Sequence, residues 1–294
     1  MQIIKVTIHA DAVLSDAISD YLIGVLDAAV EYSVDDDRTG ALHAFIIAES
    51  WLVEERKALE AAITAFAEEM AALFTVAKPI VESEVIADQD WAKNWKEYFK
   101  PFEILEGLVI APSWQPYEVQ AGEAVIVMDP GMAFGTGHHA TTRLCLQLIS
   151  MEKECYCNGG VLDVGTGTGI LGMAAALWGA ADVLGIDNDA EAVAAARHNV
   201  LENGLQNRVS ISERALSEVL ERYPLVVANI VHDVLIELAE DLLRVTSPGG
   251  LLILSGLIYP DQTSSISDCF CERGFSLLSE RQEQEWGALM LKKL

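Results

Sequence analysis

Asp163 opens a run of alternating glycines, Asp163-Val164-Gly165-Thr166-Gly167-Thr168-Gly169, and a helical pattern follows at once. Glycines at alternate positions let the backbone turn tightly and approach a ligand, and the N-terminus of the helix offers free N–H groups. Asp187 stands 22 residues after Gly165, at the offset where an acidic side chain accepts hydrogen bonds from a ribose diol. The combination predicts a site for a nucleoside cofactor.

The type of nucleoside depends on two further features. The segment Gly167-Thr168-Gly169-Ile170-Leu171-Gly172 also fits the dinucleotide pattern, so a nicotinamide cofactor is an alternative. Asp163 argues against it, because a carboxylate would repel a pyrophosphate but could hold a ligand that carries a cation. Asn229 follows another apolar run, and its amide both donates and accepts hydrogen bonds. We therefore expect Asn229 to orient an incoming amine.

These residues require a sheet that gathers them at one edge. From Gly160 onward, apolar runs alternate with helical periods, as in a doubly wound, mostly parallel α/β sheet. We expect strands over 161–164, 183–187, 225–230 and 251–257, helices over 170–177 and 190–202, and a closing strand pair over 275–278 and 288–291. Ligands of such folds bind at the carboxyl ends of the strands.

The N-terminal part has a different order of elements. Strands are expected over 4–8, 32–34, 42–48 and 81–87, with helices over 11–29 and 53–73 and a polar turn over 35–40. The order β-α-β-β-α-β is that of a ferredoxin-like α+β domain. We place this domain at residues 1–87, a linker helix at 88–101 with Trp91, Trp95 and Tyr98 on one face, and the second domain at 102–294, where strands over 108–111 and 124–128 come first.

Composition limits the partners and the compartment. The chain has 294 residues with 19 Lys and Arg against 45 Asp and Glu, a formal net charge of −26, which would repel a nucleic-acid backbone and attract a basic protein or a cationic small molecule. Five cysteines with one-residue spacings do not form a secreted disulfide framework, and no signal peptide or membrane span is recognised. We expect a cytoplasmic protein with reduced thiols, no direct nucleic-acid or membrane partner, and a monomeric state.

Adjacent histidines could indicate a metal site. His138 and His139 have no nearby carboxylates or paired cysteines, and neighbouring side chains converge poorly on one ion. The cysteine spacings also differ from those of zinc sites. We expect no metal, and interpret the two histidines as shaping a loop over the cofactor.

The motifs together resemble a known family. The acidic glycine loop, Asp187 and Asn229 are similar to those of class I S-adenosylmethionine-dependent methyltransferases. The segment from Met128 to Thr142, MDPGMAFGTGHHATT, closely resembles the PrmA family, which methylates large-subunit ribosomal protein eleven. The tryptophan-rich linker, the small N-terminal domain and the segment Ser247-Pro248-Gly249-Gly250 are also similar, so the resemblance covers essentially the whole chain. Ala140 and the connection from Cys155 to Gly160 depart from the family pattern.

This resemblance implies a fold, an activity and a set of site residues. The fold is a seven-stranded, mostly parallel methyltransferase sheet preceded by a ferredoxin-like domain that recognises the substrate protein. Asn229 would orient the amine, and the implied contacts to S-adenosylmethionine are Thr142, Gly165, Asp187 and Asn229, with Asp163, Gly167, Phe134 and Gly135 in the same motifs.

The function expected from the resemblance is transfer of methyl groups to lysine side-chain and N-terminal amines of ribosomal protein eleven. Two alternatives remain, a nicotinamide-dependent oxidoreductase and a non-catalytic adaptor that has kept the methyltransferase fold.

Overall fold

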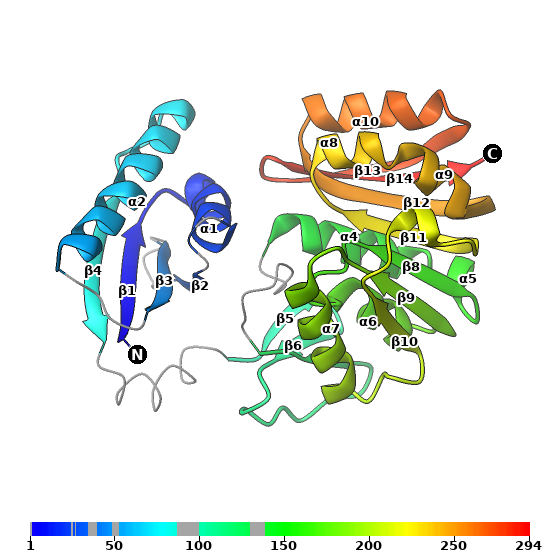
Figure 1. The fold of residues 1–294 in the computed structure, drawn as a ribbon, viewed down its shortest axis with the longest axis horizontal. Coiled ribbons are helices and arrows are strands. Elements are labelled where there is room, and N and C mark those ends of the chain that lie inside the picture. The colour runs from blue at the N-terminus through cyan, green and yellow to red at the C-terminus, as the bar shows by residue number, and fades with distance from the viewer. Residues whose placement is uncertain are drawn as a thin grey trace. The chain divides into compact units, whose positions relative to one another are not determined.

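The computed structural model describes residues 2–24, 26, 28–34, 40–48, 53–86, 100–129 and 139–294. The chain divides into two compact units, one within residues 1–100 and the other from Pro101 onward (Figure 1). The predicted turn over 35–40, apart from Gly40, and the predicted linker-helix residues Trp91, Trp95 and Tyr98 lie outside the described residues.

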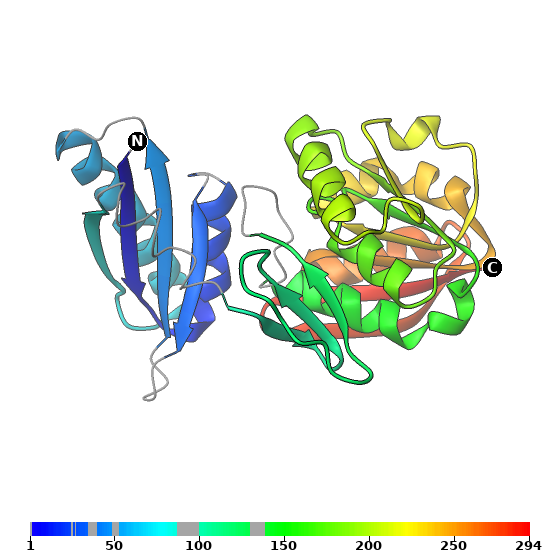
Figure 2. The ribbon, with the colours of Figure 1, turned by 90° about the horizontal axis from the view of Figure 1, so that it is seen from below.

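The first unit is an antiparallel four-stranded sheet with the strand order β2-β3-β1-β4. Alternate residues of β1, Ile4, Val6 and Ile8, are fully buried in one core with both helices, as an alternating strand pattern requires. Figure 2 shows the two helices of this unit on one face of its sheet. The elements are β1 (Gln2–His9), η1 (Ala12–Leu14), α1 (Ser15–Gly24), β2 (Ala29–Val34), β3 (Gly40–Ala48), α2 (Val53–Phe74) and β4 (Ile80–Ile86).

The β-α-β-β-α-β order is the predicted one, but the first helix is shorter than predicted. Instead of one helix over 11–29, a short 3-10 turn precedes α1, which ends at Gly24. The backbone N–H of Ala28 donates to the carbonyl of Leu22 at 2.9 Å, and β2 begins at Ala29, where pairing with Phe45 of β3 starts. Strand pairing therefore overrides the helical period of the sequence at this point.

The second unit begins with a three-stranded sheet. Its strands are β5 (Phe102–Leu105), β6 (Leu108–Ala111) and β7 (Ala124–Val127), with β5 antiparallel and β7 parallel to β6. The strands predicted over 108–111 and 124–128 correspond to β6 and β7, whereas β5 was not predicted.

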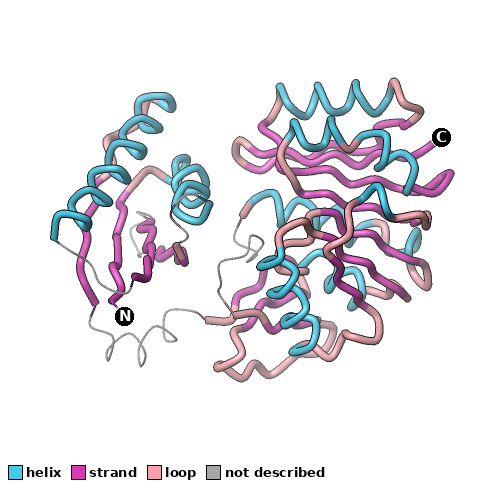
Figure 3. The backbone as a smooth tube through the Cα atoms, viewed as in Figure 1, coloured by secondary structure: helices cyan, strands magenta, loops and turns pink. Residues whose placement is uncertain are grey.

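The main sheet of the second unit has seven strands in the order β10-β9-β8-β11-β12-β14-β13, parallel except for β14, which runs antiparallel to both of its neighbours. This confirms the predicted doubly wound, mostly parallel sheet, and Figure 3 shows the alternation of strands and helices. The strands are β8 (Gly160–Val164), β9 (Asp182–Ile186), β10 (Val209–Ser212), β11 (Tyr223–Asn229), β12 (Thr246–Ile258), β13 (Phe275–Glu283) and β14 (Trp286–Lys293).

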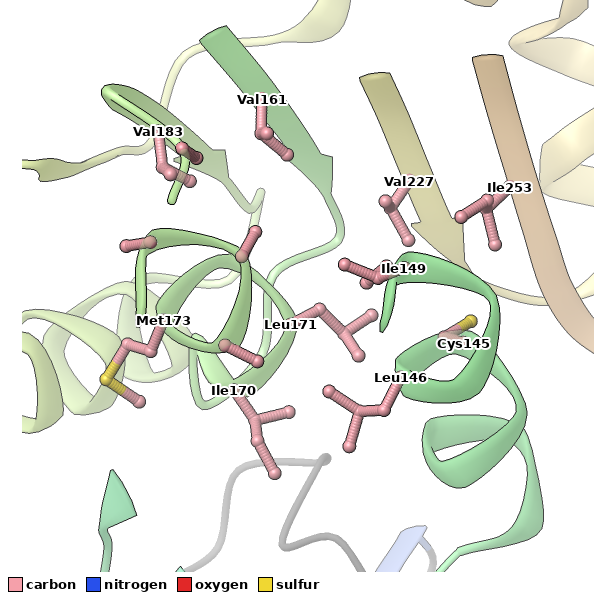
Figure 4. Close-up of a cluster of buried hydrophobic side chains, with 14 of the residues drawn as sticks. Cys145, Leu146, Ile149, Val161, Ile170, Leu171, Met173, Val183, Val227 and Ile253 are labelled. Atoms are coloured by element: carbon pink, nitrogen blue, oxygen red, sulfur yellow. The ribbon is translucent and has the colours of Figure 1, made fainter. Parts of the chain in front are cut away.

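Helices cover both faces of this sheet. On one face, α4 and α6 pack on odd-numbered strand residues such as Val161, Val183 and Val227 (Figure 4). On the other, α8, α9 and α10 pack on even-numbered residues such as Leu162 and Leu252. The helices are α4 (Ala140–Met151), α5 (Lys153–Tyr156), α6 (Ile170–Leu177), α7 (Ala190–Glu202), α8 (His232–Glu237), α9 (Ala239–Val245) and α10 (Asp261–Cys271), with η2 at Leu216–Glu218.

The bounds of α6 and α7 are those predicted from the sequence. Among the described residues, no helix has the length and apolar character needed to cross a membrane.

Candidate functional site

The parallel strands bring their carboxyl ends to one edge of the main sheet. Val164, the last residue of β8, pairs with Ile186 of β9 on one side and with Ala228 of β11 on the other. The glycine loop after β8, Asp187 after β9 and Asn229 at the end of β11 are therefore neighbours, as the sequence predicted.

The glycine loop adopts a conformation that side chains would oppose. Gly165, Gly167 and Gly169 have φ angles of +69°, +53° and +83°, in the left-handed region. The N–H groups of Gly165 and Thr166 donate to the carbonyl of Ile186 at 2.9 and 3.0 Å, which fixes the turn on β9. Gly169 is the N-cap residue of α6, so the loop leads directly into a helix N-terminus.

Asp187 lies against this loop. Its Oδ2 accepts a hydrogen bond from the N–H of Gly167 at 2.9 Å, and its Oδ1 accepts one from the N–H of Asp189 at 3.1 Å. The residue is half-buried, and a carboxylate offers about four acceptor positions in all. The carboxylate thus holds the loop and keeps acceptor capacity for a diol.

Asp163 is buried beneath the loop, only 1% exposed. Its Oδ2 accepts hydrogen bonds from Thr166 Oγ1 at 2.7 Å and from the N–H of Gly172 at 3.1 Å. The pKa of this carboxyl is raised from 3.8 to about 6, chiefly by burial; the two hydrogen bonds oppose the shift, and the charge of Asp187 adds to it. Asp163 therefore organises the loop and gives its surroundings a negative charge that a cation would stabilise.

Three of the predicted site residues carry buried oxygens that have no hydrogen-bond partner within the described part of the chain. They are Thr142 Oγ1, Asp163 Oδ1 and Asn229 Oδ1. Thr142 lies in the first turn of α4, a helix that packs on β11, β12 and β14. Buried polar atoms are nearly always satisfied in folded proteins, so unpaired oxygens at one sheet edge fit a ligand with several N–H and O–H donors.

Asn229 is paired with Ser255 of β12, whose carbonyl accepts a hydrogen bond from the N–H of Ile230 at 3.1 Å. Neither Asn229 Oδ1 nor the backbone carbonyl of Ile230 accepts a hydrogen bond from any described residue. Two free acceptors at consecutive positions are suited to bind the N–H groups of an amine.

His139 has a structural role in this edge. As the N-cap of α4, its Nδ1 accepts a hydrogen bond from the N–H of Thr141 at 3.3 Å and lies 2.7 Å from Thr141 Oγ1. Its ring packs edge-on against Trp286, with the ring centroids 4.8 Å apart. His138, Phe134 and Gly135 lie outside the described residues, and the described residues contain no group of side chains arranged to hold a metal.

Trp286 was not identified from the sequence, and Ile230 was recognised only as the end of the strand expected over 225–230. Trp286 begins β14 at the same edge of the sheet, because β14 runs antiparallel to β12, and its indole Nε1 is buried without a partner among the described residues. The only sequence signal was a tryptophan two residues before the second strand of the predicted closing pair.

His232 is close to Asn229 in the chain but is engaged elsewhere. Its Nδ1 lies 2.7 Å from Asp233 Oδ1 and its Nε2 lies 3.0 Å from Ser265 Oγ, so that it joins α8 to α10. The ring nitrogens of His232 are therefore directed at Asp233 and Ser265, not at Asn229.

Comparisons with known proteins give one consistent result. The sequence matches the family described as Ribosomal protein L11 methyltransferase (PrmA) over residues 2–294. It is 46% identical to the ribosomal protein L11 methyltransferase of Desulfotalea psychrophila over 292 residues, covering 99% of this chain and 97% of that protein. It is 37% identical to the protein of that name from Geotalea uraniireducens, covering 97% of this chain and 96% of that protein.

A solved structure is also similar. The crystal structure of ribosomal protein L11 methylase from Lactobacillus delbrueckii subsp. bulgaricus has a TM-score of 0.60 and 31% identity, covering 67% of this chain and all of that one (100%).

Proposed function

The chain belongs to the family of ribosomal protein L11 methyltransferases, and on that basis we propose that it methylates lysine side-chain and N-terminal amines of ribosomal protein L11, with S-adenosylmethionine as the methyl donor. The observation that carries this proposal is a pair of acceptors beside the glycine loop, Asn229 Oδ1 and the carbonyl of Ile230, which accept no hydrogen bond within the described part of the chain.

The residues present fit S-adenosylmethionine. Asp187 would hold the ribose hydroxyls, and the glycine loop would lie against the nucleoside. Asp163 and Thr142 would face the cationic part of the ligand, where the buried carboxylate and its unpaired oxygen favour positive charge. Phe134 and Gly135 complete the set through the resemblance of their motif. When bound, the cofactor would supply a methyl group on a positively charged sulfur: the amine lone pair forms a bond to the methyl carbon, and the carbon–sulfur bond breaks to leave a neutral thioether.

The protein must present that amine neutral and aligned. A lysine amine has a reference pKa of about 10.4 and is mostly protonated at neutral pH, but burial beside a cation lowers the pKa. Asn229 Oδ1 and the carbonyl of Ile230 would accept its N–H groups and leave the lone pair directed toward the cofactor. The displaced proton would pass to water, since the ring nitrogens of the nearby His232 contact Asp233 and Ser265 rather than the amine site.

We further propose that the N-terminal unit, residues 1–87, recognises the substrate protein. Glu82 and Glu84 are exposed on β4, and the whole chain carries a net charge of −26, which suits a basic ribosomal protein. The enzyme would act as a cytoplasmic monomer without a nucleic-acid partner.

Mass spectrometry of ribosomal protein L11 after incubation with the enzyme and S-adenosylmethionine tests the proposal and identifies the modified amines. We expect mass increases of whole methyl groups on lysine or N-terminal amines, and no increase without the cofactor. The Asn229→Ala variant should lower kcat by roughly 100-fold or more, because one of two orienting contacts is lost.

Two results would overturn the proposal. Binding of NAD without binding of S-adenosylmethionine would indicate an oxidoreductase. Binding of L11 without any methyl incorporation over a range of pH would indicate an adaptor.

A further inference from the structure

Ile230 lies between two glycines that leave no room for a side chain of their own. A Cβ atom on Gly165 would lie 2.5 Å from Ile230 Cγ2, and a Cβ on Gly256 would lie 2.5 Å from the carbonyl oxygen of Ile230 and 2.8 Å from its carbon. Real Cβ atoms do not approach other atoms this closely, so the two glycines are in direct contact with opposite parts of Ile230.

The contact with Gly256 depends on an irregularity in β12. The pairing of β12 with β14 shifts register between Ser255 and Leu257, which leaves Gly256 as an extra residue with φ +85°. Such a bulge redirects the backbone next to functional sites. Here it brings Gly256 against the carbonyl of Ile230, while the preceding carbonyl of Ser255 holds the N–H of Ile230.

The same part of β12 is fixed to the closing strand. Ser255 is fully buried, and its Oγ donates a hydrogen bond to the carbonyl of Gly287 at 2.9 Å. The bulge is therefore held on both sides, by β11 and by β14. Gly165 on the other side belongs to the cofactor loop, which is anchored to the carbonyl of Ile186.

We propose that Ile230 and Gly256 are positioning residues for methyl transfer, with Ile230 packed between the cofactor loop and the β12 bulge so that its carbonyl is set at a fixed place relative to the bound cofactor. The inference rests on the proposed function, in which that carbonyl accepts an N–H of the substrate amine. The side chain of Ile230 contacts the cofactor loop at Gly165, and Gly256 holds the backbone carbonyl of Ile230 in place.

The variant Gly256→Ala tests this directly. An added methyl group must displace the carbonyl of Ile230, so we expect kcat for methylation of L11 to fall roughly tenfold or more while the Kd for S-adenosylmethionine, measured by calorimetry, changes less than about threefold.

Gly274→Ala is the matched control. Gly274 has φ +90°, close to that of Gly256, and a Cβ there meets no atom within 4 Å. Both variants therefore place alanine at a similar positive φ, and only Gly256→Ala crowds Ile230. We expect Gly274→Ala to keep the wild-type kcat.

Ile230 provides a second test that adds no atoms, in case Gly256→Ala does not fold. Ile230→Val keeps the Cγ2 methyl group that faces Gly165, and Ile230→Ala removes it. We expect Ile230→Val to retain kcat within about threefold and Ile230→Ala to lose at least tenfold, measured at a temperature where thermal unfolding shows each variant fully folded.

The outcomes separate this inference from the proposed function. If the wild-type enzyme does not methylate L11, the proposed function fails. If it does, and Gly256→Ala and Ile230→Ala both keep the kcat of their controls, the positioning role is wrong although the function stands. Loss of folding stability with unchanged kcat would likewise assign these residues to structure alone.

Discussion

At the scale of single residues, Asp163 combines a structural role with an electrostatic cost. Its folded-state pKa of about 6 lies above the ordinary 3.8, so the folded protein binds this proton more tightly than the unfolded chain does. Protonation of Asp163 therefore contributes to the free energy of unfolding. This contribution is fully present below about pH 4 and is lost as the pH rises to 6. A two-unit shift corresponds to an upper limit of about 3 kcal/mol.

Asp163→Asn should remove this pH dependence, because an amide can still accept the hydrogen bonds from Thr166 Oγ1 and the N–H of Gly172. Urea unfolding of the cofactor-free protein at pH 4.5, 5.5 and 7 measures it. We expect the difference in unfolding free energy, variant minus wild type, to increase by about 1 to 3 kcal/mol between pH 4.5 and pH 7. Asp268→Asn, which removes an exposed charge from α10, is the control and should follow the wild-type curve. A constant difference between Asp163→Asn and wild type across this range would contradict the prediction.

At the scale of elements, α7 connects the two sheets of the second unit. Asn203, the C-cap residue of α7, accepts a hydrogen bond from the N–H of Val127 and donates one to its carbonyl, both at 2.7 Å. Val127 is the last residue of β7, an outer strand of the three-stranded sheet. The side chain thus takes the place of a neighbouring strand.

Asn203→Ala should leave the backbone groups of Val127 without these partners. We expect a loss of about 1 to 3 kcal/mol in unfolding free energy from chemical denaturation, since unsatisfied, partly buried groups carry that cost. Asn207→Ala is a matched control, because Asn207 is exposed and has no side-chain hydrogen bond to a described residue. Equal stability losses in the two variants would show that the Asn203 contacts contribute nothing specific.

Local pattern explains which elements were predicted correctly. Apolar runs and 3.6-residue periods located β8, β11, α6 and α7, and the motif spacing identified Asp163, Asp187 and Asn229. The four-residue strands β5 (FEIL) and β10 (VSIS) were missed because polar residues interrupt their short apolar pattern, whereas β7 (AVIV), which is just as short, is apolar throughout. The contacts of Ile230 with Gly165 and Gly256 join residues from three separate strands or their ends, and no local sequence pattern indicates the bulge in β12 that brings Gly256 to Ile230.

At the scale of the whole molecule, net charge should govern the encounter with the substrate protein. A charge of −26 attracts a basic partner over a distance that salt shortens, from a Debye length of about 10 Å at 0.1 M to 3 Å at 1 M. Glu82 and Glu84 lie on the same face of β4 in the proposed recognition unit, and Glu84 lies 3.9 Å from Lys5.

The double variant Glu82→Gln/Glu84→Gln tests whether this face contributes to recognition. We expect KM for L11 to rise about threefold to tenfold at low salt, with kcat and the KM for S-adenosylmethionine unchanged, because rim charges act on association rather than on chemistry. The difference in KM between the variant and wild type should shrink as the salt concentration increases.

Glu202→Gln/Glu272→Gln removes the same charge from exposed positions of the second unit and controls for net charge alone. If both double variants raise KM equally, attraction is set by the total charge and the β4 face has no particular role. If neither does so, and salt has no effect on KM for L11, the electrostatic account of substrate recognition is wrong.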